Sequence, residues 1–397
     1  EMIGRLNRPR VTEPGALFHD YCEAIYANRW RVLVFFGLVA AWALFQAAHL
    51  KSTMDNRVFF GPENPELLAL NALESAYSQN NDVLVAVEPK DGVVFQRRVL
   101  EPVRDLTERL WKIPYVSRVD SLTNFQHSRG AENDIEIRDL VPEGFNFSAE
   151  SVDRIKSIAL GEAALRNLIV SPDGKMTGIR LNFAFPRENS ESIVEITRAL
   201  AALKDEFQTK HPDLRLYFTG NVMVMQAFGE AQERDILFLV PLMLPVMGIV
   251  LYFLLRSMKA AAVALGVSGL ATIITMGIAS ALGIVMSAGS APAPFIVLTV
   301  ALAYNVHLIS EFVDGCRQGA SNRVAALNAV DCNAFAIFLT GLTTAIGFLS
   351  LNASDAPPFH DLGNISAIGV IVAFVTTFSL TPVLLLVVRV PVDRKTA

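Results

Sequence analysis

Three neighbouring side chains in an apolar stretch have the chemistry to carry protons or form hydrogen bonds inside a membrane. Tyr304, Asn305 and His307 interrupt the segment ALAYNVHLI, within a run that lacks Asp, Glu, Lys and Arg. His307 lies about one helical turn from Tyr304, which predicts that both occupy one helix face. An ionisable residue inside a membrane predicts a functional site, here a proton relay or gate. The alternative is that His307 only satisfies a carbonyl oxygen or Tyr304 by hydrogen bonding.

A second polar pair, Thr343 and Thr344, lies in the segment GLTTAIGFLSL among small residues. Small residues let helices approach closely, and threonine hydroxyls bond either across an interface or to a carbonyl one turn back in the same helix. Packing explains the glycines, whereas the threonines either pack or line a polar relay. The candidate relay or gating residues are therefore His307, Tyr304, Asn305, Thr343 and Thr344.

Six uncharged runs position these side chains, and each is long enough for a helix to cross a hydrocarbon core of about 30 Å. The chain is also 52% hydrophobic and only 18% charged, which favours a membrane protein over an ordinary soluble one. The runs are residues 32–48, 236–255, 260–286, 293–310, 333–353 and 362–388. Pro241 and Pro245 fall inside the second run, where they kink or loosen the helix, which suits either a substrate entrance or a kink without a transport role.

Basic residues in the short connections predict the orientation of the spans. They cluster before the first run and after the second, fourth and sixth, whereas the connections 287–292 and 354–361 have none. Both termini are therefore expected in the cytoplasm of a bacterial inner-membrane protein. The expected divisions are a cytoplasmic segment 1–31, a span 32–50, a periplasmic domain 51–235, five spans in 236–388 and a cytoplasmic tail 389–397. The first run lacks a small-residue cleavage site, which predicts an anchor.

The long segment between the first two spans alternates strand and helix patterns. Residues 82–88, 116–122, 176–185 and 214–219 have strand character, and residues 95–113 and 190–210 have helical spacing of apolar side chains. Two such β-α-β units predict ferredoxin-like subdomains, each with its helices packed on one face of its own sheet. Residues 221–235 predict a helix that runs directly into the second span. Residues 314–331 predict an amphipathic helix along the cytoplasmic face.

Other functional classes lack their motifs in this sequence. GxSxG, GxxxxGK[ST] and HExxH are absent, and the six His are scattered, so we expect no enzyme, metal or cofactor. The sequence contains no basic stripe of the kind that indicates nucleic acid binding. Cys22, Cys316 and Cys332 have no CxxC spacing and are expected to be buried or unreactive thiols.

Three segments carry a resemblance to a known family over nearly the whole chain. GLTTAIGFLSL (341–351) is the most specific, LGNISAIGVIVAFVTTFSLTPVLLL (362–386) ends in a Thr-Pro pair, and VSRVDSLTN (116–124) lies in the α/β domain. These segments, with the order of one span, a domain and five spans, resemble one repeat of the resistance-nodulation-division (RND) transporters, in their MMPL lipid-exporting branch. The resemblance implies export of a hydrophobic lipid such as a hopanoid, a sterol or an acyl lipid, driven by protons.

The resemblance also implies a carboxylate in the fourth span, and here the sequence departs from it. Tyr304 stands where an Asp is expected three residues before His307. Because tyrosine has a reference pKa near 10, it shuttles protons poorly at neutral pH. The family has two six-span halves, so a second half, in the same chain, a longer chain or a homodimer, is expected to supply the missing Asp opposite Tyr304 and His307.

Two other functions remain open at this stage. A non-transporting lipid sensor or assembly subunit with a sterol-sensing-like arrangement would also lack the carboxylate, and a Sec-type translocation accessory has a similar topology. The partners expected under the leading hypothesis are the membrane, a lipid-like substrate, a second half and a periplasmic lipid-binding protein.

Overall fold

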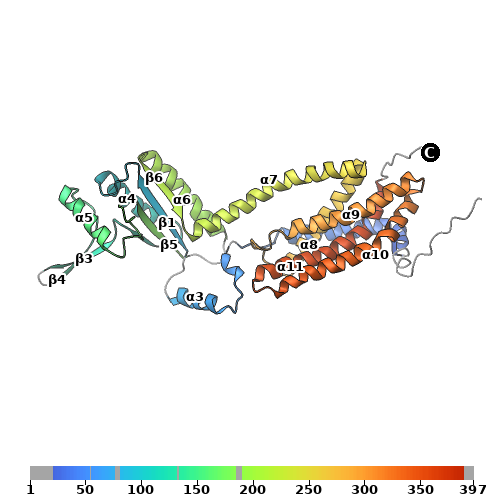
Figure 1. Ribbon diagram of the computed structural model, residues 1–397, viewed down its shortest axis with the longest axis horizontal. Helices are drawn as coiled ribbons and strands as arrows, with labels where there is room; N and C mark the ends of the chain where they lie inside the picture. Colours follow the sequence, from blue (N-terminus) through green and yellow to red (C-terminus); the bar gives the residue numbers. More distant parts are fainter. Residues whose placement is uncertain (1–20, 54, 77–80, 132–133, 185–189, 389–397) are drawn as a thin grey trace, which may run out of the picture. The chain divides into compact units, whose positions relative to one another are not determined.

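A computed structural model describes residues 21–388, apart from residues 54, 77–80, 132–133 and 185–189 (Figure 1). Two compact units are present: an α/β unit of residues 54–56 and 62–233, and a helical unit that contains residues 57–61 and 234 onward together with the chain before residue 54. The expected tail 389–397 and most of the expected N-terminal segment lie outside the described residues.

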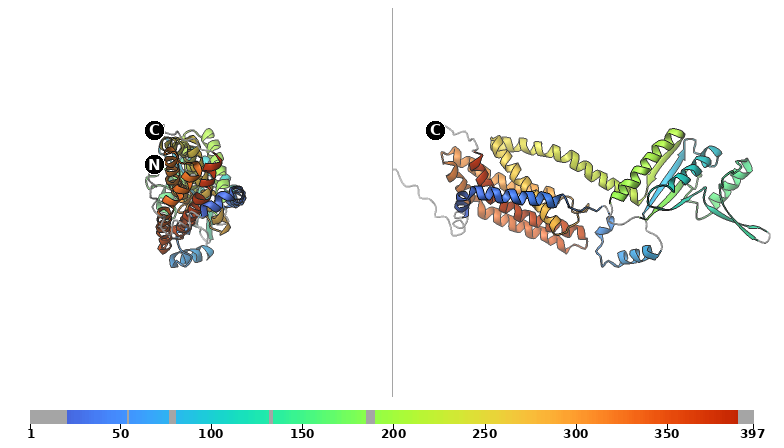
Figure 2. Two further views of the ribbon diagram at one scale, coloured as in Figure 1. Left: turned by 90° about the vertical axis from the view of Figure 1, so that its right-hand side faces the viewer. Right: turned by 180° about the vertical axis from the view of Figure 1, so that it is seen from behind.

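Six helices of the described residues are long and apolar enough to cross a membrane, as the uncharged runs predict. They begin with α2 (Arg29–Ala47), and the last of the six is interrupted, so that α11 and α12 together form it. The others are α7 (Asn221–Leu255), α8 (Met258–Ala281), α9 (Ala293–Arg317) and α10 (Asn322–Leu349), followed by α11 (Pro357–Ser379) and α12 (Thr381–Val387). Short 3-10 turns cover Asn56–Phe59 and Ser350–Ala353. In the helical unit, α8 to α11 run beside one another (Figures 1 and 2).

Close helix contacts in this unit depend on glycines, which have no side chain to keep the helices apart. A Cβ added to Gly277 of α8 would lie 2.7 Å from the Cα of Ala43 in α2. One added to Gly369 of α11 would lie 2.9 Å from Cγ1 of Val297 in α9. These approaches are what small residues permit in membrane helices. They place α8 and α11 at the centre of the unit, where more than half of each span is buried, whereas α2 and α7 are mostly exposed.

One prediction for the ends of the helices is wrong, and the sixth predicted span contains a break that the sequence did not predict. The amphipathic helix expected at residues 314–331 is not separate, because α9 continues to Arg317 and α10 is one helix from Asn322 through the predicted boundary. The sixth span breaks after Ser379, and α12 starts at Thr381 with Pro382 in its first turn. Proline lacks the backbone N–H that a continuous helix would use there.

The α/β unit contains one four-stranded antiparallel sheet, with the order β2-β5-β1-β6. The two predicted β-α-β units therefore join in a single sheet instead of forming one sheet each, because β1 pairs with both β5 and β6. The elements are β1 (Asp82–Pro89), α4 (Arg97–Leu110), β2 (Val116–Ser121), β5 (Thr177–Phe183), α6 (Ser190–Lys210) and β6 (Leu214–Thr219). Phe185, the predicted end of the third strand, lies outside the described residues.

One face of this sheet carries the core of the unit. Val83, Val85 and Val87 alternate on β1 and are fully buried. They share a hydrophobic cluster with the apolar stripes of α4 and α6, which both cover this face (Figures 1 and 2). Strand alternation on one side and helical spacing on the other thus meet at a common apolar layer.

An insertion between β2 and β5 adds elements that the sequence patterns did not predict. They are a two-stranded hairpin of β3 (Gln126–Ala131) and β4 (Asp134–Asp139), followed by α5 (Ala149–Gly161). Before β1, the helix α3 covers Pro65–Ala76. The expected helix at 221–235 is the first part of α7, which continues without interruption into the second span.

Candidate functional site

Asn305 of α9 is the centre of a polar cluster inside the helical unit. Its side chain is fully buried. The Nδ2 atom donates one hydrogen bond to Oγ of Ser268 in α8 at 3.2 Å and another to the carbonyl of Ala301, in the same helix, at 2.9 Å. Thr381 of α12 donates from its Oγ1 to Oδ1 of Asn305. Asn305 therefore joins three helices through uncharged hydrogen bonds, which suits a polar group in an apolar interior.

Two members of this cluster were not among the predicted site residues. Ser268 is a single hydroxyl in the uncharged run of α8, and Thr381 belongs to the Thr-Pro pair that closes the sixth span. A polar residue inside an uncharged run was the available signal for both. The break between α11 and α12 gives Thr381 its position, because it starts a new helix beside Asn305.

Tyr304 is also buried, with 4% of its surface exposed, and its hydroxyl has no hydrogen-bond partner among the described residues. The ring extends towards α10, where a Cβ added to Gly341 would lie 3.1 Å from the Tyr304 hydroxyl oxygen. Gly341 thus provides the space that the phenol occupies. A buried hydroxyl without a partner is costly, and such groups are a reason to look for a function or a bound water.

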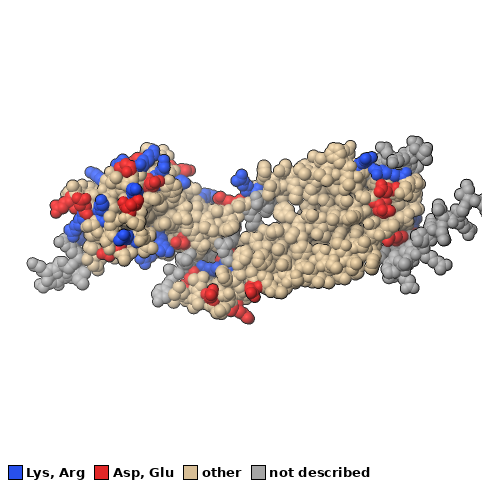
Figure 3. Space-filling view, in the orientation of Figure 1, with Lys and Arg blue, Asp and Glu red and all other residues tan. Residues whose placement is uncertain are grey.

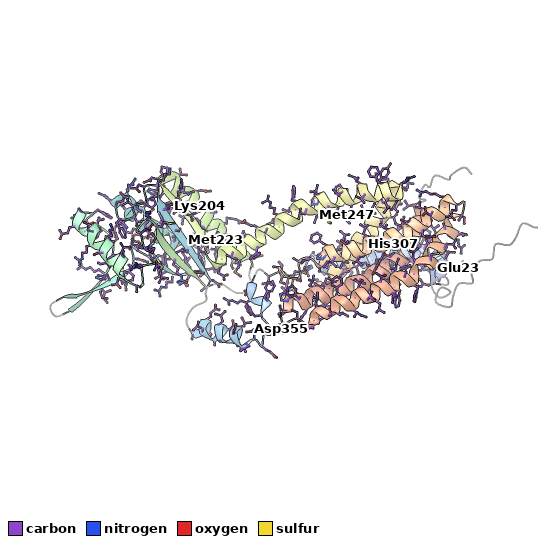
Figure 4. The ribbon with its side chains drawn as sticks, in the orientation of Figure 1. Glu23, Lys204, Met223, Met247, His307 and Asp355 are labelled. Atoms are coloured by element: carbon purple, nitrogen blue, oxygen red, sulfur yellow. The ribbon has the colours of Figure 1, made fainter. Side chains whose placement is uncertain are left out.

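His307 lies in a different environment from Tyr304. Its side chain is exposed on α9, and Figure 4 places it along the helical unit between Glu23 at one end and Asp355 at the other. The two side chains, predicted to occupy one helix face, therefore lie in different environments. A spacing of three residues leaves about 60° between two side chains on a helix, which here separates the inside of the unit from its surface.

The first of the two threonines of α10 likewise lies outside the interior of the unit. Thr343 is exposed, and its Oγ1 donates within its own helix to the carbonyls of Leu339 at 3.1 Å and Thr340 at 3.0 Å. Thr344 is half-buried. The structure thus brings Asn305 beside Tyr304 in the interior, and it places His307 and Thr343 on the outside.

The exposed surface of α10 has two different flanks. On one flank of Gly341, the ring of Phe338 contacts that of Phe374 in α11, with centroids 5.9 Å apart. Large apolar side chains are exposed on this flank and include Leu342, Ile346 and Leu349. Because Gly341 itself faces Tyr304, the opposite flank lies on the side of α9, and its exposed residues are Ala336, Thr340, Thr343 and Gly347.

We call the small-residue flank of α10 together with the adjoining exposed face of α9 the α9–α10 face. On α9, its residues are Thr299, Ala303, His307 and Glu311, which recur at intervals of four. Both the small residues and the polar side chains distinguish this face from the large apolar flank. In Figure 3, the middle of the visible face of the helical unit carries no Lys, Arg, Asp or Glu side chain.

Pro241 and Pro245 lie in the exposed part of α7, which continues as a helix through both. The side chains of α7 that join the helical core, Leu251 and Leu255, come later in the helix. A Cβ added to Gly248 would also lie 3.5 Å from Cδ1 of Leu265 in α8. The proline-containing part of α7 thus precedes the part that packs against the other spans.

The three cysteines, expected to be buried or unreactive, differ in burial. Cys22 and Cys316 are buried, whereas Cys332 on α10 is exposed, so only its reactivity stays a prediction. The environment of Cys22 is apolar, and its burial, together with the charge of Asp331, raises the pKa of the thiol to about 12. Within the described residues, no three His, Cys, Asp or Glu side chains are grouped as ligands for a metal ion.

Six helices long and apolar enough to cross a membrane, with an α/β domain between the first two, define the class of multi-pass membrane proteins. Residues 71–392 match the MMPL family, and the chain belongs to that family. The family assignment confirms the resemblance found in the sequence.

Individual relatives are distant. A protein of Methanocaldococcus jannaschii described as a membrane protein, MJ1562, is 20% identical over 361 residues, which are 88% of this chain and 88% of that protein. The heme uptake protein MmpL11 of Mycobacterium tuberculosis is 25% identical over 185 residues, 45% of this chain and 19% of that protein. MmpL11 of Mycobacterium bovis, which carries the name of a transport protein, has the same identity and coverage. The chain therefore spans most of one relative and about a fifth of the others.

Proposed function

We propose that this chain is one six-span half of a lipid transporter of the RND type, and that its α9–α10 face packs against a second six-span half. The observation that carries the proposal is the exposure of His307 on that face. An ionisable side chain that faces lipid is costly, and in membrane proteins such groups face the bundle interior, a cavity or a partner. A second half would place His307 in an interior.

The small residues of α10 support the same proposal. Ala336 and Thr340, and likewise Thr343 and Gly347, are four positions apart on one exposed flank. This small-xxx-small spacing lets a second helix approach the backbone closely. The flank beside α11 has Phe338, Leu342 and Ile346 instead, which suit contact with lipid chains.

In this proposal, protons pass between His307 and a carboxylate of the second half. The interior of this half offers Asn305 and the hydroxyl of Tyr304, neither of which changes its charge at neutral pH. Tyr304 occupies the position at which the family resemblance implies an Asp. In this proposal, the carboxylate that the family resemblance implies for the fourth span therefore comes from the second half.

The substrate in this proposal is a hydrophobic lipid, such as a hopanoid, a sterol or an acyl lipid, that enters from the membrane beside the proline-containing part of α7. Pro241 and Pro245 support this role because each removes a backbone hydrogen bond and loosens the helix. The α/β unit then receives the lipid on the periplasmic side of a bacterial inner membrane, with both termini in the cytoplasm. Its strand order, with two β-α-β units in one antiparallel sheet, supports a ferredoxin-like porter domain.

The test is lipid movement in liposomes that hold the purified protein, measured with and without a pH gradient. We expect movement that depends on the gradient, and we expect His307→Gln to abolish the dependence because glutamine binds no proton. Tyr304→Phe should leave protein stability unchanged or slightly higher, since the hydroxyl has no partner to lose.

Two results would decide against the proposal. Gradient-independent lipid movement, or tight lipid binding without movement, would favour the lipid sensor. An unchanged pH dependence in both His307→Gln and Tyr304→Phe would make His307 a structural residue. A matched control is Thr299→Val, which alters a polar side chain on the same face of α9 without removing a titratable group.

A further inference from the structure

We propose that a cavity in the insertion of the α/β unit binds a single acyl chain that ends in a carboxylate or a phosphate. This inference deepens the proposed function, on which it rests, because it names a chemical class for the lipid and a place where the α/β unit holds it. The cavity lies between the β3–β4 hairpin, the segment that follows β4, and α5, with a volume of about 310 Å³.

One face of α5 forms one wall of the cavity. Ser151, Arg154, Ile155 and Ile158 line it, at the intervals of three and four that place residues on a single helix face. The start of this helix is fixed by Ser148, whose Oγ accepts a hydrogen bond from the backbone N–H of Ser151 at 3.2 Å. The wall is therefore set by the helix and its cap.

The hairpin forms the opposite wall. His127 of β3 and Arg138 of β4 both line the cavity and are direct partners in the antiparallel register, which places them side by side on one face. The segment after β4 is held to the rest of the unit by two backbone hydrogen bonds. They join Leu140 N–H to the Phe125 carbonyl at 2.9 Å and Val141 N–H to the Thr123 carbonyl at 3.1 Å.

The floor of the cavity is apolar and belongs to the core of the unit. Leu140 and Ile155 are buried in the main hydrophobic cluster, and Phe145 and Ile158 pack against it. Pro142, which also lines the cavity, accepts a hydrogen bond on its carbonyl from Arg104 of α4 at 3.2 Å. An apolar chain placed here would bury its surface against side chains that are already fixed.

The rim is charged and has more basic than acidic side chains. Arg138 and Arg154 line the cavity together with His127 and one acid, Asp139. Arg154 makes no ion pair with a carboxylate in the described part of the chain, so its guanidinium is available to a ligand. Guanidinium groups bind carboxylates and phosphates with two parallel hydrogen bonds.

The size and the polarity together select the ligand class. A volume of about 310 Å³ is at the lower end of the range for small-molecule sites, which suits one acyl chain better than a lipid with two chains. The apolar floor and the arginines at the rim predict a chain in the cavity and an anionic head between Arg138 and Arg154.

The experiment uses the full chain in nanodiscs and a decanoate analogue that carries a photoactivatable diazirine. After illumination, peptide mass spectrometry should find the label on residues 126–158. Unlabelled decanoate and decyl phosphate should compete with the label, and decanol, with the same chain and no charge, should compete about tenfold more weakly. The better of the two anionic competitors tells whether the natural head is a carboxylate or a phosphate.

Three variants distinguish binding of the probe in the cavity from its nonspecific adsorption to the protein. Arg154→Gln should raise the decanoate concentration needed for half competition about tenfold. Arg198→Gln, which changes an exposed arginine on α6, should leave it unchanged. Ser151→Phe adds volume at the cavity wall and should remove labelling of residues 126–158 altogether.

Equal competition by decanol and decanoate would overturn the proposal, as would labelling that persists in Ser151→Phe or an equal effect of the two arginine variants. The measurement needs neither a second half nor a pH gradient. Labelling of residues 126–158 without gradient-driven transport would therefore contradict only the proposed function, and transport without this labelling would contradict only the cavity.

Discussion

The Nδ2 atom of Asn305 in α9 donates a hydrogen bond to Oγ of Ser268 in α8 over 3.2 Å, deep inside the helical unit. Ser268 in turn donates to its own-helix carbonyl of Ala264 at 2.7 Å, and Thr381 of α12 donates to Asn305. These bonds make one cluster from three helices without any charged side chain. The cluster therefore holds the helices in register at a depth where a charge would be costly.

Replacing Asn305 by leucine should destabilise the helical unit. The change removes the bonds to Ser268 and Thr381 and leaves the Thr381 hydroxyl without its partner. Interhelical hydrogen bonds in membranes are worth about 0.6 kcal/mol each and at most about 1.7 kcal/mol. We expect a loss of about 1–2 kcal/mol in the free energy of unfolding, measured by denaturant titration in mixed micelles.

The control for that variant is Thr272→Val on α8. Thr272 is half-buried and its hydroxyl donates to the Ser268 carbonyl of its own helix, so its loss should change stability little. Equal losses for Asn305→Leu and Thr272→Val would show that the Asn305 cluster has no special part in holding the helices.

Replacing Gly369 by alanine should push α11 away from α9. The new Cβ would lie 2.9 Å from Cγ1 of Val297 and 3.1 Å from its Cβ, so the helices must move apart. Overpacking of this kind costs about 1–3 kcal/mol. Gly266→Ala on α8 is the matched control, because nothing lies within 4 Å of its added Cβ.

Val297→Ala should rescue the Gly369→Ala variant, since it removes the methyl groups that the new Cβ meets. The two changes should therefore be non-additive in a double-mutant cycle on the free energy of unfolding. Strict additivity would mean that Gly369 and Val297 do not pack against each other.

The three cysteines should react at very different rates with an apolar maleimide. Cys332 is exposed, whereas Cys22 and Cys316 are buried. The folded chain in detergent should therefore take up one label near neutral pH and three after denaturation in SDS. Because the Cys22 thiol has a pKa of about 12, an increase to pH 9 should not add it to the labelled set. Mass spectrometry of labelled peptides measures this, and labelling of Cys22 in the folded chain would contradict its burial.

The spans could be predicted from the sequence because hydrocarbon imposes a simple requirement. A run of about 20 residues without charges is enough to indicate a spanning helix. The prediction that Asn305 has a role also rested on this requirement, since a polar residue in such a run needs partners. Ser268 and Thr381 are also polar residues in uncharged runs, but their pairing with Asn305 could not be predicted, because they come from α8 and α12 and only the folded bundle brings them together.

The sequence patterns did not predict the direction in which individual side chains point. The spacing of Tyr304 and His307 predicts that they share a helix face, yet Tyr304 is buried in the unit and His307 is exposed on its surface. The β3–β4 hairpin was missed for another reason. Its strands are rich in charged residues, such as Arg129, Glu136 and Arg138, so they lack the apolar alternation that indicates a strand.

The most direct measurement for the proposed pairing compares cross-linking at two neighbouring positions of α10. Thr343 lies on the α9–α10 face and Leu342 on the apolar flank. In a Cys332→Ala background, Thr343→Cys and Leu342→Cys are reconstituted at low protein density and treated with a flexible bis-maleimide. A symmetric pair brings the same surface patch of both copies together. With a second copy of this chain as the second half, we predict covalent dimers for Thr343→Cys and monomers for Leu342→Cys, and equal cross-linking at both positions, or monomers at both, would contradict this pairing.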